Sequence, residues 1–167
     1  MWRCIKTLSL LFLLACTSAA CSRMPTATGG LKVAFISDVH LSDIFADFAD
    51  CELPDTKIPG TQRKVLIRTM QSQLNSTRLF NENYFAFIAA LDDVAQRGIK
   101  LVILPGDFSD DGQPYNVRGL EKILRSYSES FGMEFFIING NHDPVWPLTT
   151  DGGKSNFLGE NGKSQPI

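Results

Sequence analysis

The amino-acid sequence predicts an α/β fold, in which a parallel sheet is flanked by amphipathic helices. Three short apolar stretches of strand length, residues 31–38, 100–105 and 134–138, are separated by segments with helical periodicity. Parallel neighbours need long crossover connections, and the intervening helices supply them. The composition, 44% hydrophobic and 20% charged over 167 residues, is that of one ordinary globular domain.

The first strand, residues 31–38, is apolar and β-branched and ends at Asp38. Residues 41–59 contain two prolines and no sustained period, so we expect a loop there. A helix is predicted over residues 62–74, because Val65, Leu66 and Met70 would share one side.

The next helix is predicted to begin at Asn81 or Asn83, since asparagine side chains cap helices by accepting backbone N–H bonds. Its apolar stripe runs over residues 87–95, and Gly98 ends it. After the strand at 100–105, apolar residues recur at helical spacing from Leu120 to the stop at Gly132. The third strand, 134–138, follows. Residues 148–167 are polar and glycine-rich, and we expect a poorly ordered tail.

The N-terminal residues have the pattern of a secretory leader. Arg3 and Lys6 precede a short apolar run over residues 8–15, and small residues follow up to residue 20. The run falls well short of the roughly 20 apolar residues that a membrane-spanning helix needs. We therefore expect residues 1–20 to be a signal peptide or a lipoprotein leader, with lipid attachment at Cys16 or Cys21 as one alternative and simple cleavage as the other. Either makes the protein exported: periplasmic, an outer-membrane lipoprotein or extracellular.

Each predicted strand leads into residues that can bind a metal ion. Asp38 and His40 follow the first strand, Asp107 follows the second, and Asn141 follows the third. Since the carboxyl ends of parallel strands meet at one edge of a sheet, these residues should converge. Carboxylate, imidazole and amide ligands suit divalent metals such as Mn, Fe or Zn. A single Asp-x-His would usually be an ordinary turn, whereas three clusters in this order indicate one metal site.

These clusters resemble the first three signature blocks of the calcineurin-like metallophosphoesterases. The resemblance covers residues 31–147 and implies the family's two packed sheets with flanking helices, of which this part of the chain would supply the first half. The blocks that carry it are Asp38-Val39-His40, Gly106-Asp107-Phe108-Ser109-Asp110-Asp111-Gly112 and Gly140-Asn141-His142-Asp143.

The resemblance also implies a set of roles. Two divalent metal ions would be bridged by Asp107, with Asp38 and His40 on the first ion and Asn141 on the second. Together the ions would neutralise the oxygens of a phosphate ester, the implied substrate. His142, held by Asp143, would stabilise the developing charge or protonate the leaving oxygen.

Neighbouring residues in the same blocks have supporting roles. Side chains at Gly106 and Gly140 could obstruct the close turns that aim Asp107 and Asn141, although glycine is also common in ordinary strand-end turns. Asp110 and Asp111 could orient groups around the metals, or they could cap the following segment.

The sequence departs from the family pattern in its histidines. The family has further histidines in the second half of its domain, including a Gly-His-x-His block, whereas the two histidines here are His40 and His142. We therefore expect an N-terminal fragment of a phosphoester hydrolase whose activity requires the missing ligands. The alternatives are an exported, non-catalytic metal-binding or interaction module, and a short enzyme that borrows ligands from a second copy.

Composition limits the partners. A net charge of -2 and a pI near 5.6 provide no broad basic surface, so nucleic-acid binding is not indicated. The sequence indicates no protein partner. It does not choose among phosphomonoesters, phosphodiesters, nucleotides and pyrophosphates.

Overall fold

A computed structural model describes residues 29–50, 56–143, 156–159 and 161–166. All the helices and strands discussed below belong to one compact unit, Lys32–Ile167. The predicted leader, with Cys16 and Cys21, lies outside the described residues, as do residues 148–155 of the predicted tail. In the part of the chain that is described, no helix combines the length and the apolar character that crossing a membrane requires.

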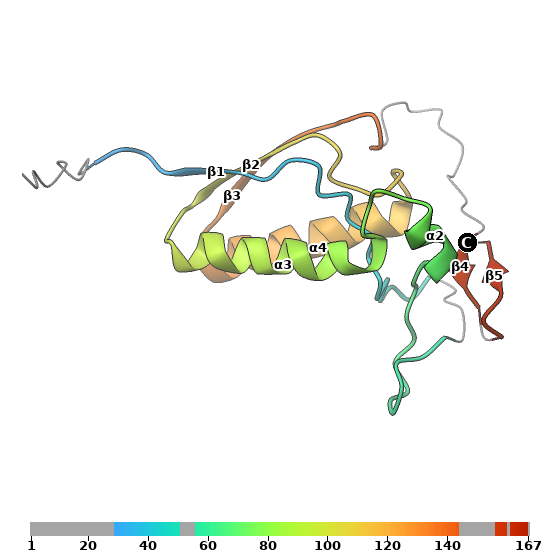
Figure 1. Ribbon diagram of the computed structural model, residues 1–167. Coiled ribbons are helices and arrows are strands. Elements are labelled where there is room, and N and C mark those ends of the chain that lie inside the picture. Colours follow the sequence, from blue (N-terminus) through green and yellow to red (C-terminus); the bar gives the residue numbers. More distant parts are fainter. Residues whose placement is uncertain (1–28, 51–55, 144–155, 160, 167) are drawn as a thin grey trace, which may run out of the picture. The chain divides into compact units, whose positions relative to one another are not determined.

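Three parallel strands form the sheet that the sequence predicts. They are β1 (Val33–Phe35), β2 (Leu101–Pro105) and β3 (Glu134–Ile138), and β2 lies in the middle (Figure 1). The register pairs Phe35 with Ile103 and Ile103 with Phe136, so the three strands end at the same edge of the sheet. The α/β fold with three strands in chain order is therefore confirmed.

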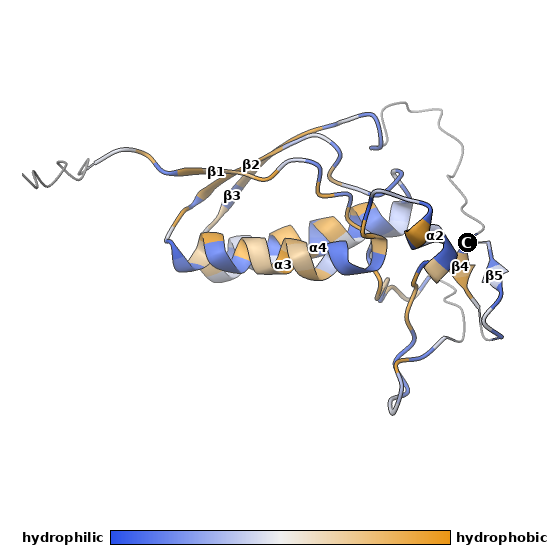
Figure 2. Cartoon of the chain, in the orientation of Figure 1, coloured by the Kyte–Doolittle hydropathy of each residue, from blue (hydrophilic) through white to orange (hydrophobic). Residues whose placement is uncertain are grey.

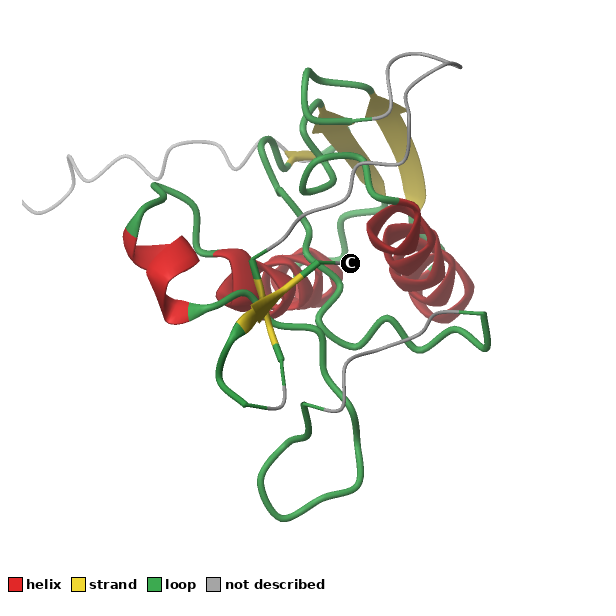
Figure 3. Cartoon of the chain, turned by 90° about the vertical axis from the view of Figure 1, so that its right-hand side faces the viewer, coloured by secondary structure: helices red, strands yellow, loops and turns green. Residues whose placement is uncertain are grey.

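Two long helices cover one face of this sheet. They are α3 (Phe80–Gln96) and α4 (Pro114–Phe131), which lie on the same side of the strands in two perpendicular views (Figures 1 and 3). Val102 and Leu104 of β2 point into this layer and are fully buried. Both belong to the main core, together with Phe87, Leu91 and Val94 of α3 and Leu120, Ile123, Leu124 and Tyr127 of α4.

The opposite face of the sheet is open and apolar. Phe35, Phe136 and Ile138 are 69%, 56% and 63% exposed, although hydrophobic residues of strands are usually covered. Figure 2 shows hydrophobic colour on the strands as well as on the helices. We call Phe35, Phe136 and Ile138 the open face. It agrees with the expectation of the first half of a two-sheet fold.

The helix predicted over residues 62–74 is mostly wrong. The only helix there is α2 (Met70–Leu74), which Thr69 caps by accepting a bond from the Ser72 N–H. Val65 and Leu66, which suggested a helical face, donate their N–H groups to Thr56 and Ile44 instead. Both are buried. Long-range backbone bonding has overridden the local apolar spacing.

The expectation of a poorly ordered tail is wrong for the described residues 156–159 and 161–166. They contain β4 (Phe157–Leu158) and β5 (Ser164–Gln165), which pair antiparallel. Phe157 is fully buried and forms a second, smaller core with Ala46, Leu66 and Tyr115. The polar composition suggested disorder, but the burial of one aromatic side chain, Phe157, is enough to anchor the segment.

The helix ends follow the predictions at the C-terminal side only. Gly98, directly after α3 and Arg97, and Gly132, which ends α4, have the left-handed φ values of +66° and +63° typical of such positions. At the start of α3 the cap residue is Leu79, which makes no side-chain cap bond. Asn81 instead binds the backbone of Arg68 through both ends of its amide.

The one-sided core gives a direct test. Leu104→Ala should lower the free energy of unfolding by about 2–5 kcal/mol, because it leaves a cavity in a fully buried position. Ile138→Thr, on the open face, should change it by no more than about 0.5 kcal/mol. Urea unfolding of the two variants beside the unchanged chain measures both. Equal losses would mean that both faces of the sheet are covered.

Candidate metal centre

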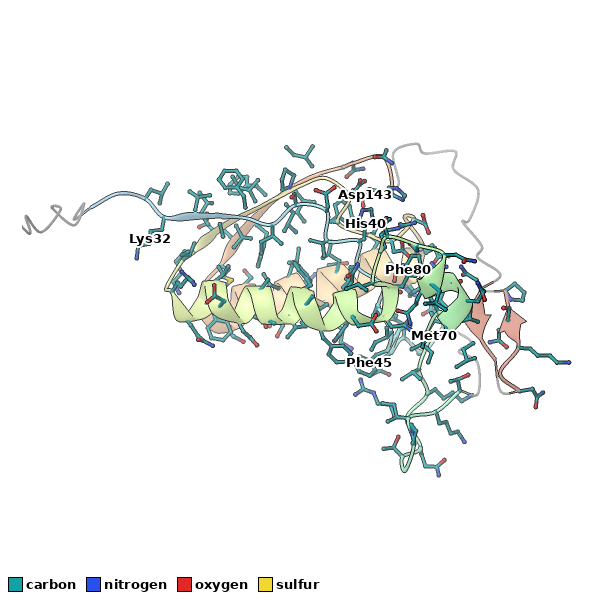
Figure 4. The ribbon with its side chains drawn as sticks, viewed as in Figure 1. Lys32, His40, Phe45, Met70, Phe80 and Asp143 are labelled. Carbon is teal, nitrogen blue, oxygen red and sulfur yellow. The ribbon has the colours of Figure 1, made fainter. Side chains whose placement is uncertain are left out.

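Backbone hydrogen bonds continue past the ends of β1 and β2 and hold the two following loops side by side. The N–H groups of His40 and Leu41 donate to the carbonyls of Asp107 and Phe108 at 2.8 and 3.0 Å, and Asp110 N–H donates back to Leu41 at 2.9 Å. Figure 4 shows His40 near this end of the sheet, with Asp143 from the third loop close by. The carboxyl ends of the strands therefore converge, as predicted.

Three of the predicted metal ligands come together here. Asp38, His40 and Asp107 each offer one ligand atom, and these atoms lie within 4.8 Å of one another. Nε2 of His40 is 4.0 Å from Oδ2 of Asp107. Asp38 is exposed and the other two are partly buried, so the group is accessible. Two carboxylates and one imidazole are a fitting donor set for a divalent ion such as Mn, Fe or Zn.

The backbone at these three ligands is strained. The φ values of Asp38, His40 and Asp107 are +52°, +43° and +48°, in the left-handed region that residues other than glycine rarely adopt. Each such residue costs about 1–3 kcal/mol and persists only where its surroundings impose the conformation. Here the loop-to-loop hydrogen bonds impose it, and strain of this kind clusters at functional sites.

The predicted importance of two glycines is confirmed. A methyl group on Gly140 would overlap the backbone nitrogen and the carboxylate of Asp107. Gly106 has a φ of +99°, and a methyl group there would lie 3.3 Å from the Cα of Gly140. The loops after β2 and β3 thus approach each other so closely that only glycine fits.

The third loop brings His142 onto Asp107. The His142 N–H donates to Oδ1 of Asp107 at 2.8 Å, and the imidazoles of His142 and His40 meet edge to face with their centroids 4.8 Å apart. Asn141, the predicted ligand of the second metal, lies between Gly140 and His142 and is exposed. All three loops therefore contribute to one centre.

Asp143 does not hold the His142 ring as predicted. Its buried carboxylate accepts bonds from the N–H groups of Phe108, Ser109 and Gly140, and from the Ser109 hydroxyl. The carboxylate beside Nδ1 of His142 is that of Asp111, at 3.1 Å. Because its carboxylate is occupied by N–H groups of the second and third loops, Asp143 ties these two loops together. Asp111 instead lies beside the His142 ring, where Asp143 was expected.

Two arginines from other segments reach the same centre. The sequence did not single out Arg68, whereas Arg78 begins a polar stretch over residues 78–84 for which the sequence allows either a pocket lining or a helix-capping segment. Arg68 and Arg78 donate to Oδ2 and Oδ1 of Asp110 at 2.7 and 2.6 Å. Burial raises the pKa of Asp110 and Asp111 acts in the same direction, while Arg68 and Arg78 oppose both. Of the two roles left open for Asp110 and Asp111, the orienting role fits these contacts, since the cap residue of α4 is Gln113.

Comparison with known proteins indicates the family of the chain. The sequence model of the calcineurin-like phosphoesterase family matches residues 31–166, beyond the expected limit at residue 147. A probable cyclic nucleotide phosphodiesterase of Synechococcus sp. is 38% identical over 72 residues, a match that covers 43% of this chain and 27% of that protein. The chain thus spans about a quarter of the length of that relative.

The contact between Gly140 and Asp107 predicts the effect of one methyl group. Gly140→Ala should lower the free energy of unfolding of the metal-free chain by about 1–3 kcal/mol, because the loop must shift away from Asp107. Gly30→Ala is the matched control, since a methyl group there meets nothing within 4 Å. Thermal unfolding in the presence of a chelator compares them. Equal stability of the two variants would contradict the close approach.

Proposed function

Because the chain belongs to the calcineurin-like phosphoesterase family, we propose that it serves metal-dependent hydrolysis of phosphoric esters at the common edge of β1, β2 and β3. The observation that carries this proposal is the group of Asp38, His40 and Asp107, whose ligand atoms lie within 4.8 Å of one another. Its strained backbone supports the proposal, because such strain is maintained where function requires it.

Two divalent ions, of Mn, Fe or Zn, fit the proposed roles of the ligands. Asp38 and His40 would hold the first, Asn141 the second, and Asp107 both. When bound, the ions would supply positive charge that neutralises the oxygens of the phosphate group. The protein contributes the fixed positions, since Oδ1 of Asp107 is held by the His142 N–H and the loops cannot separate without breaking backbone bonds.

His142 is the proposed proton-transfer group. With its Nδ1 directed at Asp111, the other ring nitrogen is left to exchange a proton with an ester oxygen. Asp111 orients the ring, as a carboxylate beside a catalytic imidazole does. Asp143 is a positioning residue that acts through the backbone of the second and third loops.

We propose that full activity needs ligands beyond those in this sequence. The second ion would have only Asp107 and Asn141, and both histidines of the sequence already lie at the centre. The missing ligands would come from a longer protein, which agrees with the fraction of the relative that the chain spans, or from a second copy. The open face is a place where such additional structure could pack.

The substrate class and the location follow as proposals. The relative in Synechococcus sp. bears the name of a probable cyclic nucleotide phosphodiesterase, which makes phosphodiesters the first class to test. The leader pattern of residues 1–20 supports export, with membrane attachment through Cys16 or Cys21 as one form of it.

Metal binding by the full chain tests the proposal. The unchanged chain should retain Mn or Zn after dialysis, measured by mass spectrometry of the metal, and Asp107→Asn should lower the affinity at least about tenfold, because it removes a ligand charge. Asp93→Asn, on the exposed side of α3, should leave the affinity unchanged.

Hydrolysis of a chromogenic phosphodiester and a phosphomonoester, followed on the same samples, distinguishes the alternatives. Metal-dependent turnover that Asp107→Asn abolishes supports the hydrolase. A folded chain that binds metal specifically and hydrolyses neither ester favours the non-catalytic module. A chain that binds no metal rejects both.

A further inference from the structure

Arg78 projects into the metal centre from a segment outside the three strand-end loops. It lies between α2 and α3, and its Nη1 is 3.5 Å from Nδ1 of His40 and 3.4 Å from Nδ1 of His142. A full positive charge thus borders both histidines of the site. Such a charge needs a reason, since the same centre must also hold cations.

Neutralising Asp110 alone does not explain Arg78, whose Nη1 also lies 3.8 Å from Oδ1 of Asp111. Arg68 already pairs with that carboxylate at 2.7 Å, and the Arg68 side chain is 1% exposed. Arg78 makes the second ion pair with Asp110, at 2.6 Å, but its side chain is 26% exposed. Arg68 is therefore the buried partner of Asp110, whereas Arg78 pairs with the same carboxylate and keeps part of its side chain exposed.

Orienting the histidines does not explain Arg78 either. A guanidinium only donates hydrogen bonds. When Nε2 of His40 ligates a metal, the ring proton is on Nδ1, and two donors cannot bond to each other. Nδ1 of His142 already faces Asp111 at 3.1 Å. The contacts of Arg78 with the two rings are therefore close approaches and not hydrogen bonds. Its positive charge remains available to a ligand that binds beside the rings.

The side chain is held in place before any ligand arrives. The Arg78 N–H donates to the Ser76 hydroxyl at 3.0 Å, which fixes the turn. The guanidinium lies over the ring of Phe80, 5.1 Å from its centroid, and Phe80 is buried at the first residue of α3. Among the described residues, the hydrogen bond of this guanidinium to Asp110 and its close approaches to the two rings all involve Nη1.

We propose that Arg78 binds non-bridging oxygens of the substrate phosphate, while its ion pair with Asp110 fixes the position of the guanidinium. The role rests on the proposed function. Phosphate and guanidinium form paired, charge-assisted hydrogen bonds, and a pre-positioned arginine loses little freedom in making them. Arg78 is then a substrate-binding residue supplied by the segment before α3, separate from the metal ligands.

Inorganic phosphate is the probe that tests this role. The full chain, loaded with Zn, is dialysed to equilibrium against radiolabelled orthophosphate, and the metal content of each sample is measured in parallel. Arg78→Ala should weaken phosphate binding by about tenfold to a hundredfold, the loss expected for a charged hydrogen-bond donor, at unchanged metal content. Arg78→Lys should recover part of the affinity, because lysine keeps the positive charge but cannot donate two parallel hydrogen bonds as a guanidinium does. Arg97→Ala, on the surface of α3, is the matched control and should bind phosphate as the unchanged chain does.

The outcomes separate the two proposals. Unchanged phosphate affinity in Arg78→Ala overturns the role of Arg78, and so does an unchanged chain that holds metal but no phosphate. Loss of both metal and phosphate in Arg78→Ala and in Arg78→Lys also overturns it, since Arg78 would then act only by supporting the ligands. An unchanged chain that binds no metal rejects the proposed function itself, and the role of Arg78 with it.

Discussion

The pairing of backbone groups beyond the ends of β1 and β2 is the constraint on which the metal centre depends. It forces Asp38, His40 and Asp107 into left-handed conformations and so aims their side chains at one point. The third loop can join only because Gly140 lacks a side chain and because the Asp143 carboxylate binds N–H groups of both the second loop and the third. Burial of apolar side chains in the hydrophobic core, between the sheet and the helices α3 and α4, offsets the free-energy cost of this strain.

The parts of the fold with a strong periodic signal could be predicted from the sequence. The three strands, the stripe of α3, the end of α4 at Gly132 and the order of the metal-binding clusters all follow from local patterns. Their convergence then follows from parallel pairing alone. Where a short apolar spacing competed with long-range bonds, as at Val65 and Leu66, the local pattern failed, because the carbonyls of Thr56 and Ile44, outside the predicted helix, accepted bonds from those N–H groups.

The supporting residues of the site could not be predicted, because their partners are distant in the chain. Arg68 and Asp110 are 42 residues apart, and Asp143 and Ser109 are 34 apart. No local pattern encodes such pairs. The placement of Arg78 beside both imidazoles likewise depends on the turn before α3, and the polar stretch over residues 78–84 could not distinguish a pocket lining from a helix-capping segment. Buried Phe157 shows the same limit, since its partners Leu66 and Tyr115 lie in other segments.

X-ray absorption spectroscopy at the Zn edge tests most directly whether this sheet edge binds a cation. With one equivalent of Zn, the full chain should show nitrogen and oxygen ligands at about 2.0–2.2 Å and the scattering pattern of a bound imidazole. His40→Ala should lose the imidazole signal, whereas His142→Ala should keep it, because His142 is placed beside the metals rather than on them. An imidazole signal that survives in His40→Ala, or that disappears in His142→Ala, would contradict the account.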